Sequence, residues 1–233
     1  MLKSSITLTG HLLIKKFEED GTLVYQTEVP NLIVTAGKEF IASRMVGETY
    51  DAMNYMAIGD SSAVSALANT SLVNELGRVE LSNATPTGTT TLFTALFPAG
   101  TATGNIVEAG IFNQPSTAVV KFNGATNVGS NTITYAGHGF ADGDKVTYTN
   151  GGGTSIGGLT TGNTYYVIEV TSSTFKLATT YANAIANSPI TLTDGVGDNH
   201  KIIYGTMLAR TTFPLITKSA SQAISISWVV SVG

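Results

Sequence analysis

Apolar and polar residues alternate along most of the chain with the period of two that is typical of β-strands. The clearest example is QAISISWVVSV at 222–232, in which apolar residues at even positions from 224 onward alternate mostly with serine. A strand of this kind turns one face toward a core and the other toward weakly polar surroundings. We therefore expect a strand over 222–232, with Trp228 in the core.

Further strands are expected in the first half of the chain. ITLTGHLLIKKF and TLVYQTEV, separated by EEDG, predict a β-hairpin whose reversal is formed by Asp20 and Gly21. The same mixture of β-branched, aromatic and alternating polar residues predicts strands over 54–60, 78–84, 89–97 and 105–113.

Two segments have helical periodicity instead. In TAGKEFIASRMV at 35–46, Thr35 is suited to cap the first amide groups of a helix, and Phe40 lies on its apolar face. NTSLVNELG at 69–77 predicts a second, shorter helix that ends at Gly77.

EAGIFN at 108–113 and GTMLARTTF at 205–213 have the pattern of two hairpin arms, although about ninety residues separate them. Because hairpin loops normally contain about two to five residues, the intervening segment is expected to be a folded unit of its own. We divide the chain into a host domain, 1–116 and 205–233, and an inserted module, 117–204. Insertions are tolerated at exposed loop tips, so the module is expected to project outward.

The expected fold class is mostly β: a β-sandwich-like host domain with one or two short helices, and a small all-β module. The module is expected to contain about six strands, and TYANAIANS at 180–188 predicts a helical turn. The strand-like segments of the module are NTITY, KVTYT, NTYYVIEV, TFKLAT, PITLT and KIIY.

The glycine-rich segment NGGGTSIGGLTTG at 150–162 raises the question of a phosphate-binding loop. A Walker loop requires Lys and then Ser or Thr after its last glycine, whereas Gly158 is followed by Leu159. A dinucleotide-binding loop would require glycine where Ile156 stands. We therefore expect an exposed, mobile reversal between two strands that binds no nucleotide.

Composition narrows the class of partner. Only 12% of the residues are charged, about half of the ~25% typical of soluble domains, which suits a surface that neighbours partly bury. The net charge is −4 and no basic cluster extends beyond Lys15 and Lys16, so nucleic acid is not expected as a partner. The absence of cysteine excludes disulfides, thiolate metal sites and cysteine nucleophiles.

No apolar run reaches the roughly 18 residues that span a membrane, and the N-terminal segment lacks the unbroken apolar stretch of a signal peptide. We therefore expect no membrane partner, and a protein that is made and kept in the cytoplasm or leaves the cell by lysis.

Two histidines lie in loops that also contain aspartates. These groups are His138 with Asp142 and Asp144, and His200 with Asp194 and Asp198. If the two loops met, they could bind a divalent cation, but the spacing lacks the third acid and the closing glutamate of an EF-hand. We prefer the interpretation that Asp and Gly shape turns and that each histidine packs a loop, so no metal-ligating residue is assigned.

Glutamates of the host domain were considered for the carboxylate pair of a glycoside hydrolase. They are Glu39, Glu48, Glu75, Glu80 and Glu108. Glu108 lies within an apolar strand, so we expect it either to point to solvent or, as the preferred interpretation, to form an ion pair with Arg78 or Arg210. No serine stands in a G-x-S-x-G motif. We therefore assign no catalytic or cofactor-binding residue and expect neither an enzyme nor a cofactor.

An ordered series of blocks resembles a known family. The blocks are VPNLIVTAGKEFIASRM, YMAIGD, LVNELGRVEL, TALFPAGTATGNIVEAGIFN and GTMLARTTFPLITKSASQAISISWVVSV. Over roughly residues 12–113 and 205–233 they are similar to small virion structural proteins of tailed bacteriophages, of the tail-fibre, collar or head-decoration kind. The module, with HGFADGDKVTYTNGGG and LTTGNTYYVIEV, resembles a β unit of phage virion proteins and bacterial adhesins. Neither resemblance implies an active site.

The resemblance implies a non-enzymatic structural accessory protein located in the virion, with the host domain docked on the particle and the module displayed. Because no long repeat is present, a head decoration or a tail or collar component fits better than a complete fibre. The expected partners are capsid or tail proteins and further copies of the chain, so that the protein is an oligomer.

Two other functions remain open. A receptor-binding adhesin would recognise a cell-surface glycan through exposed aromatic residues of the module, for which the candidates are Phe140, Tyr165, Tyr166 and Tyr181. A carbohydrate-active enzyme that uses the module as a binding domain has no motif to support it.

Overall fold

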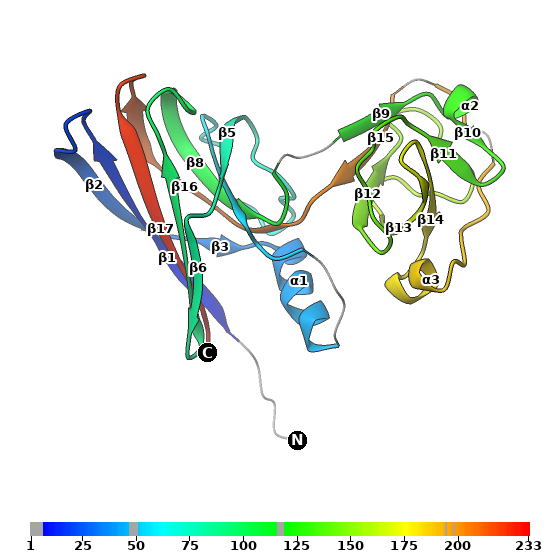
Figure 1. Ribbon diagram of the computed structural model, residues 1–233, viewed down its shortest axis with the longest axis horizontal. Coiled ribbons are helices and arrows are strands. Elements are labelled where there is room, and N and C mark those ends of the chain that lie inside the picture. The colour runs from blue at the N-terminus through cyan, green and yellow to red at the C-terminus, as the bar shows by residue number, and fades with distance from the viewer. Residues whose placement is uncertain (1–6, 47–50, 116–118, 194, 198) are drawn as a thin grey trace. The chain divides into compact units, whose positions relative to one another are not determined.

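The computed structural model describes residues 7–46, 51–115, 119–193, 195–197 and 199–233. About half of these residues are in β-strands and the helices are three short ones, which confirms the expected mostly β fold class (Figure 1). Contacts divide the chain into two compact units. One comprises Met1–Met45, Asp51–Pro115 and Thr206–Gly233, and the other is chiefly Ser116–Gly205. The host domain and the module correspond to these units.

Among the described residues, no helix combines the length and apolar character needed to cross a membrane.

The first sheet of the host domain has the antiparallel strand order β2-β1-β17-β7-β6. Its strands are β1 (Leu8–Phe17), β2 (Leu23–Pro30), β6 (Asn83–Thr87), β7 (Thr90–Phe97) and β17 (Ala223–Val232). The alternation read from the sequence decides which face is buried: Ile226 and Trp228 are fully buried, whereas Ser227 between them is half-buried on the outer face. The N-terminal hairpin and the core position of Trp228 are thus confirmed.

The second sheet of the host domain has the order β3-β16-β8-β4-β5. Its strands are β3 (Leu32–Ile33), β4 (Tyr55–Gly59), β5 (Glu75–Glu80), β8 (Gly104–Phe112) and β16 (Met207–Lys218). The expected first helix is present as α1 (Thr35–Met45) and buries Phe40. The two sheets bury their inner faces in a β-sandwich-like arrangement (Figure 1).

β8 and β16 are the two arms of the interrupted hairpin. They pair antiparallel, with Met207 opposite Phe112 at the end where the module is inserted. At that point the Asn113 N–H donates to the Thr206 carbonyl at 3.2 Å, and the Thr206 N–H donates to Asn113 Oδ1 at 2.6 Å. The expected pairing across the insertion is confirmed, and residues of the host domain close the hairpin themselves.

The prediction of a helix at 69–77 is wrong. Residues 69–74 form no helix, and β5 begins directly after them. The N–H groups of Val73 and Asn74 donate to the Glu108 carboxylate at 3.2 and 2.9 Å. A tertiary contact therefore takes the amides that a helix would have used, and it overrides the local periodicity.

The segment 78–84 is in strands, as expected, but it belongs to two strands in different sheets and not to one. β5 belongs to the second sheet and β6 to the first. The chain crosses between them at Leu81, whose N–H donates to the Asn54 carbonyl beside β4, and at Ser82, whose N–H donates to the Thr94 carbonyl on β7. Only the partner strands on either side reveal this crossing.

The module is built on one antiparallel sheet of seven strands in the order β10-β11-β14-β13-β12-β15-β9. They are β9 (Val119–Phe122), β10 (Val128–Gly129), β11 (Thr132–Thr134), β12 (Lys145–Thr149), β13 (Thr164–Thr171), β14 (Thr174–Ala178) and β15 (His200–Tyr204). β9 and β10 were not expected, and PITLT forms no strand but only an isolated bridge from Thr193 to Gly157. The core is rich in aromatic residues, with Phe122, Tyr148 and Phe175 among its buried side chains.

Two short helices complete the module. α2 (Gly124–Asn127) was not expected, and it begins where Asn123 Oδ1 accepts the N–H groups of two following residues. α3 (Tyr181–Ile185) confirms the expected helical turn, with Thr180 as its N-terminal cap.

The glycine-rich segment joins β12 to β13, as expected. Its first part, Gly151–Gly153, is exposed. Its second part is not a free reversal, because Ile156 and Leu159 are buried in the module core and Gly157 pairs with Thr193. The expectation of a wholly exposed loop is therefore wrong: two apolar side chains anchor the second half.

Candidate functional site

His138 is a buried structural residue of the module. The Phe140 N–H donates to its Nδ1 at 3.0 Å, so Nε2 carries the proton and donates to the Thr171 carbonyl at 2.8 Å. The ring also packs edge-on against Phe175. Both ring nitrogens are engaged within the protein, so neither offers a lone pair to a metal ion.

His200 is held in a similar way, through Tyr148. The Ile156 N–H donates to the Tyr148 hydroxyl at 2.9 Å, and the hydroxyl donates to His200 Nδ1 at 2.8 Å. Nε2 then carries the proton and donates to the Val196 carbonyl at 3.1 Å. The two rings are stacked, and burial raises the pKa of Tyr148. His200 therefore closes a neutral, buried hydrogen-bond chain.

The described aspartates near these histidines shape loops. Asp142 Oδ1 accepts the Glu169 N–H at 2.7 Å, and Asp144 Oδ2 accepts the Ala141 N–H at 2.8 Å. Asp194 and Asp198 lie outside the described residues. Within the part of the chain that the structure describes, no three potential ligands come together as a metal site.

Glu108 forms an ion pair with Arg210, one of the two arginines expected. Both side chains are fully buried, and Glu108 Oε2 accepts from Nε and Nη2 of Arg210 at 2.9 and 2.7 Å. The guanidinium also donates to Asn69 Oδ1 and to the Ala63 carbonyl. The ion pair therefore fastens the segment between β4 and β5 to the β8–β16 hairpin, and its role is structural.

Among the described residues, the other glutamates considered above form no catalytic pair. Glu75 pairs with Arg78 at 2.6 Å, and the Arg78 guanidinium lies 3.7 Å from the centre of the Phe112 ring. Glu39 and Glu80 are exposed on α1 and β5, and Glu48 lies outside the described residues.

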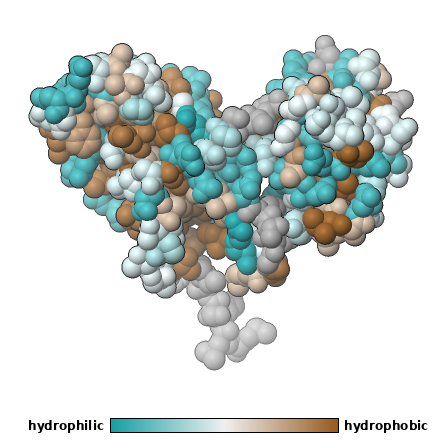
Figure 2. Space-filling model, viewed as in Figure 1, coloured by the Kyte–Doolittle hydropathy of each residue, from teal (hydrophilic) through white to brown (hydrophobic). Residues whose placement is uncertain are grey.

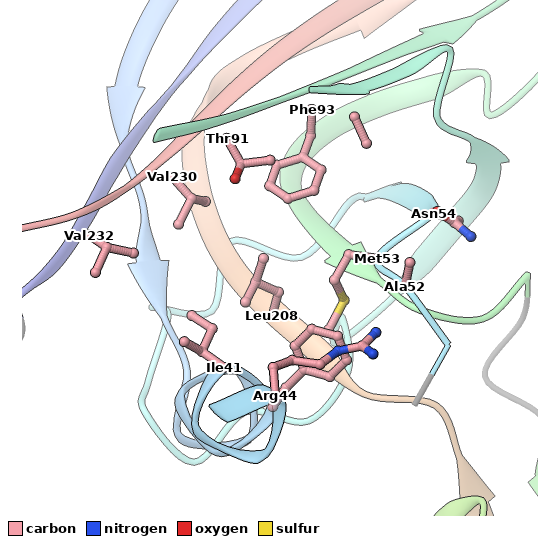
Figure 3. Close-up of a pocket in the computed structure, with 12 residues that line it drawn as sticks. Ile41, Arg44, Ala52, Met53, Asn54, Thr91, Phe93, Leu208, Val230 and Val232 are labelled. Atoms are coloured by element: carbon pink, nitrogen blue, oxygen red, sulfur yellow. The ribbon is translucent and has the colours of Figure 1, made fainter. Parts of the chain in front are cut away.

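An apolar pocket opens in the host domain between α1 and the first sheet (Figure 3). Its volume is about 440 Å³, within the range of small-ligand sites. Leu208 and Met53 line its buried part, and the Arg44 guanidinium lies 4.9 Å from the centre of the Phe40 ring. We call this cavity the host pocket. It suits an inserted apolar side chain better than a polar substrate.

The most distinctive surface of the host domain is the outer face of β17, β7 and β6. These three adjacent strands contain no Asp, Glu, Lys or Arg. Their outward side chains pair across the strands, with Val229 opposite Leu92 and Ser225 opposite Leu96. Leu92 and Leu96 are 38% and 50% exposed. We call this surface the uncharged face.

Figure 2 shows how polarity is distributed on the visible side of the host domain. Hydrophilic residues gather at the tip of the β1–β2 hairpin, where Glu18, Glu19 and Asp20 stand, whereas hydrophobic and weakly polar residues mix over the strands beneath it.

The aromatic residues considered for glycan binding are mostly not at the surface. Phe140 and Tyr165 are buried in the module core, so the prediction that they are exposed for glycan binding is wrong. Tyr166 and Tyr181 are half-buried, with ring centres 6.3 Å apart in an edge-to-face arrangement. They brace α3 against β13 and do not form an open stacking platform.

Sequence reasoning missed both the host pocket and the uncharged face, although the lack of charged residues in β6, β7 and β17 was visible in the sequence. What was missing was the strand order that makes these three segments neighbours. Comparisons of the chain with protein-family models, with curated proteins and with solved structures give no match.

Proposed function

We propose that the chain is a non-enzymatic structural accessory protein of a tailed-phage virion. Its host domain docks on the particle, and the module is displayed as part of a head decoration or of a tail or collar component. The observation that carries the docking is the uncharged face of β17, β7 and β6. The virion context is supported by the ordered sequence blocks described above.

The uncharged face has the chemistry of a surface that a protein partner can cover. Burying a charged side chain costs far more free energy than burying a hydroxyl that can be hydrogen-bonded again. The cores of protein interfaces are correspondingly depleted of charge. A face of Ser, Thr, Val and Leu can therefore be desolvated by a capsid protein, a tail protein or another copy of the chain.

The host pocket adds a second feature next to this face. Phe93 and Val230, which line the pocket from the inner face of the sheet, belong to the same strands that carry Leu92 and Val229 outward. A partner lying over the end of these strands can insert an apolar side chain into the pocket. Such an anchor in a cavity is a common source of interface affinity.

The buried polar groups support a structural rather than a catalytic role. His138, His200, Glu108 and Arg210 all have partners within the fold. Catalytic groups, in contrast, must be able to reach a substrate.

The test uses purified particles of the phage that encodes the chain. We expect mass spectrometry to find the protein in particles and, after separation, in either the head or the tail fraction. Recombinant protein should reattach to particles that lack it. Leu92→Asp with Leu96→Asp should abolish this attachment, because burying the two carboxylates would cost several kcal/mol. The control is Leu215→Asp, which replaces another exposed leucine of the host domain, in the other sheet.

Particles that lack the protein would contradict the proposal. Attachment of the double variant as tight as that of the unchanged protein would contradict the docking surface, while leaving the virion assignment in place.

A further inference from the structure

The outer face of β13 and β14 is a surface that α3 covers only in part. The register places Tyr166 beside Ala178 and Ile168 beside Lys176 on this side. α3 packs on both strands, and its Ala184 joins Ile168 and Ala178 in a small buried cluster. Because α3 has only five residues, it covers the Ala178 end and leaves the Lys176 end open.

The open end is a hollow of about 320 Å³, which we call the module hollow. Ile168 forms its floor, and its walls are Asp142, Glu169, Lys176, Ile185 and Asn187. A register shift in β13 between Glu169 and Thr171 leaves Val170 49% exposed at the margin. Figure 2 shows hydrophobic residues over α3, where Ile185 is 56% exposed. Polar groups and small apolar surfaces therefore lie side by side.

The polar groups of the hollow present both acceptors and donors. Asp142 uses Oδ1 to accept the Glu169 N–H, which fixes the position of this carboxylate. Within the described part of the chain, Lys176 Nζ has no hydrogen-bond or ion-pair partner. Asn187, held with a positive φ of 51° just after α3, adds an amide.

This arrangement selects against charged ligands of either sign. A cation would meet the Asp142 carboxylate but also the ammonium group of Lys176, and an anion would meet Lys176 but also Asp142. A hydroxyl group both donates and accepts, so adjacent hydroxyls can satisfy both kinds of group at once. The apolar C–H face of a sugar ring can rest on Ile168 and Ile185. The volume lies at the lower end of the range for small-ligand sites, which suits one ring.

We propose that the module hollow binds a neutral monosaccharide unit through Asp142, Lys176 and Asn187. The inference goes beyond the structural role proposed above and does not depend on it, because sugar binding by the module and attachment by the host domain are measured separately. It replaces the buried aromatics Phe140 and Tyr165 with a polar site of different residues.

The experiment titrates the full chain, labelled with ¹⁵N, with four neutral sugars in turn: methyl β-glucopyranoside, methyl β-galactopyranoside, methyl α-mannopyranoside and N-acetylglucosamine. We expect at least one to cause saturable amide shifts at 142, 168–170, 176 and 185–187, with a Kd of about 1–10 mM, as suits one small polar ligand. Glucuronate, methylammonium and glycerol should each bind at least about fivefold more weakly, because they lack either neutrality or the ring.

Three variants test the site itself. Ile185→Trp places a large side chain at an exposed position over the hollow and should weaken binding at least about tenfold. Lys176→Met should weaken it about fivefold or more through loss of a donor. Lys121→Met is the matched control, since it removes the same charge from an exposed position on β9, at the far edge of the sheet, and it should leave the Kd unchanged.

Failure of all four sugars to saturate any shift would overturn the proposal. So would equal binding of glycerol, unchanged binding by the Ile185→Trp variant, or an equal loss in the Lys121→Met control. None of these outcomes would affect the attachment test of the host domain.

Discussion

The host domain and the module bury polar groups in opposite ways. The host domain buries full charges: Glu108 with Arg210, and Lys218, whose Nζ donates to the carbonyls of Pro98 and Thr101 at 2.9 and 3.0 Å. The module instead buries the neutral chain of Tyr148 and His200, and His138.

The two units bury different polar groups because these side chains connect different parts of the chain. Arg210 and Lys218 both lie on β16, and each reaches a loop of the host domain that has no regular structure of its own at that point. A long cationic side chain can satisfy several carbonyl groups at once. The rings of the module bridge shorter gaps, where a donor and an acceptor on one side chain are enough. Buried charge should therefore make the host domain the more sensitive unit to polar substitution.

The largest effect is expected for Glu108→Ala. It leaves the Arg210 guanidinium buried without its counter-ion, which should cost about 3–5 kcal/mol of host-domain stability. Trp228, the only tryptophan of the chain, lies in the host core, so its fluorescence in a urea titration reports this transition. Glu80→Ala, at an exposed position, should change stability by less than about 0.5 kcal/mol. A loss below about 1 kcal/mol for Glu108→Ala would contradict the structural role of the ion pair.

In the module, the largest loss of stability is expected from replacing a glycine that has a positive φ angle. Gly152 and Gly158 have almost equal φ angles of 92° and 91°. A Cβ on Gly152 would meet nothing within 4 Å, whereas on Gly158 it would collide with the Thr191 carbonyl oxygen. Gly152→Ala should cost about 1 kcal/mol through strain alone. Gly158→Ala should cost about 2–4 kcal/mol through strain and the clash.

Thermal unfolding followed by module amide signals compares the two glycine variants. Equal losses would show that residues 156–159 are not held against 190–193, contrary to the structure.

Tyr148→Phe should destabilise the module by about 1–3 kcal/mol. The change leaves the Ile156 N–H and His200 Nδ1 without the hydroxyl that joins them. Chemical unfolding monitored by module amide signals should show the loss, while Trp228 fluorescence should not change its midpoint. A shift of both transitions would mean that the two units do not unfold independently.

Alkaline pH should move the stabilities of the two units in opposite directions. Burial lowers the pKa of Lys218 from 10.5, so the unfolded state binds more protons below that value and host stability rises as pH approaches it. Burial raises the pKa of Tyr148 from 10.0, so the folded module keeps its proton longer and its stability falls as pH rises above that value. Urea midpoints between pH 8 and 11 measure both slopes. Lys218→Met should flatten the pH dependence of the host domain alone, and Tyr148→Phe should flatten that of the module alone.

The smallest effect on the host domain is expected from removing the module. Joining Ser116 to Gly205 should leave the β8–β16 hairpin intact, because Asn113 and Thr206 close it. The Trp228 transition should stay cooperative and shift by less than about 1 kcal/mol. An insoluble or non-cooperative product would show that the host domain needs the module.

Much of the fold could be predicted from local pattern. The strand at 222–232, the N-terminal hairpin, α1 and the interrupted hairpin all follow from periodicity and turn residues, which are properties of adjacent positions. The short strands β9 and β10 have too few residues to show a period. The candidate sites were harder to predict from the sequence, because the module hollow joins residues from a loop, two strands and the end of α3.

The sequence by itself determined that the chain is a mostly β protein, interrupted after β8 by a second compact unit, and that its charge is sparse. Tertiary structure alone decided that 69–74 is not helical, that Glu108 faces Arg210, and which of the module's aromatic residues are buried. The physical reason is distance along the chain. Periodicity reports which side of a segment is apolar, whereas a carboxylate that takes the amides of a helix candidate 34 residues away acts only once the strands have paired.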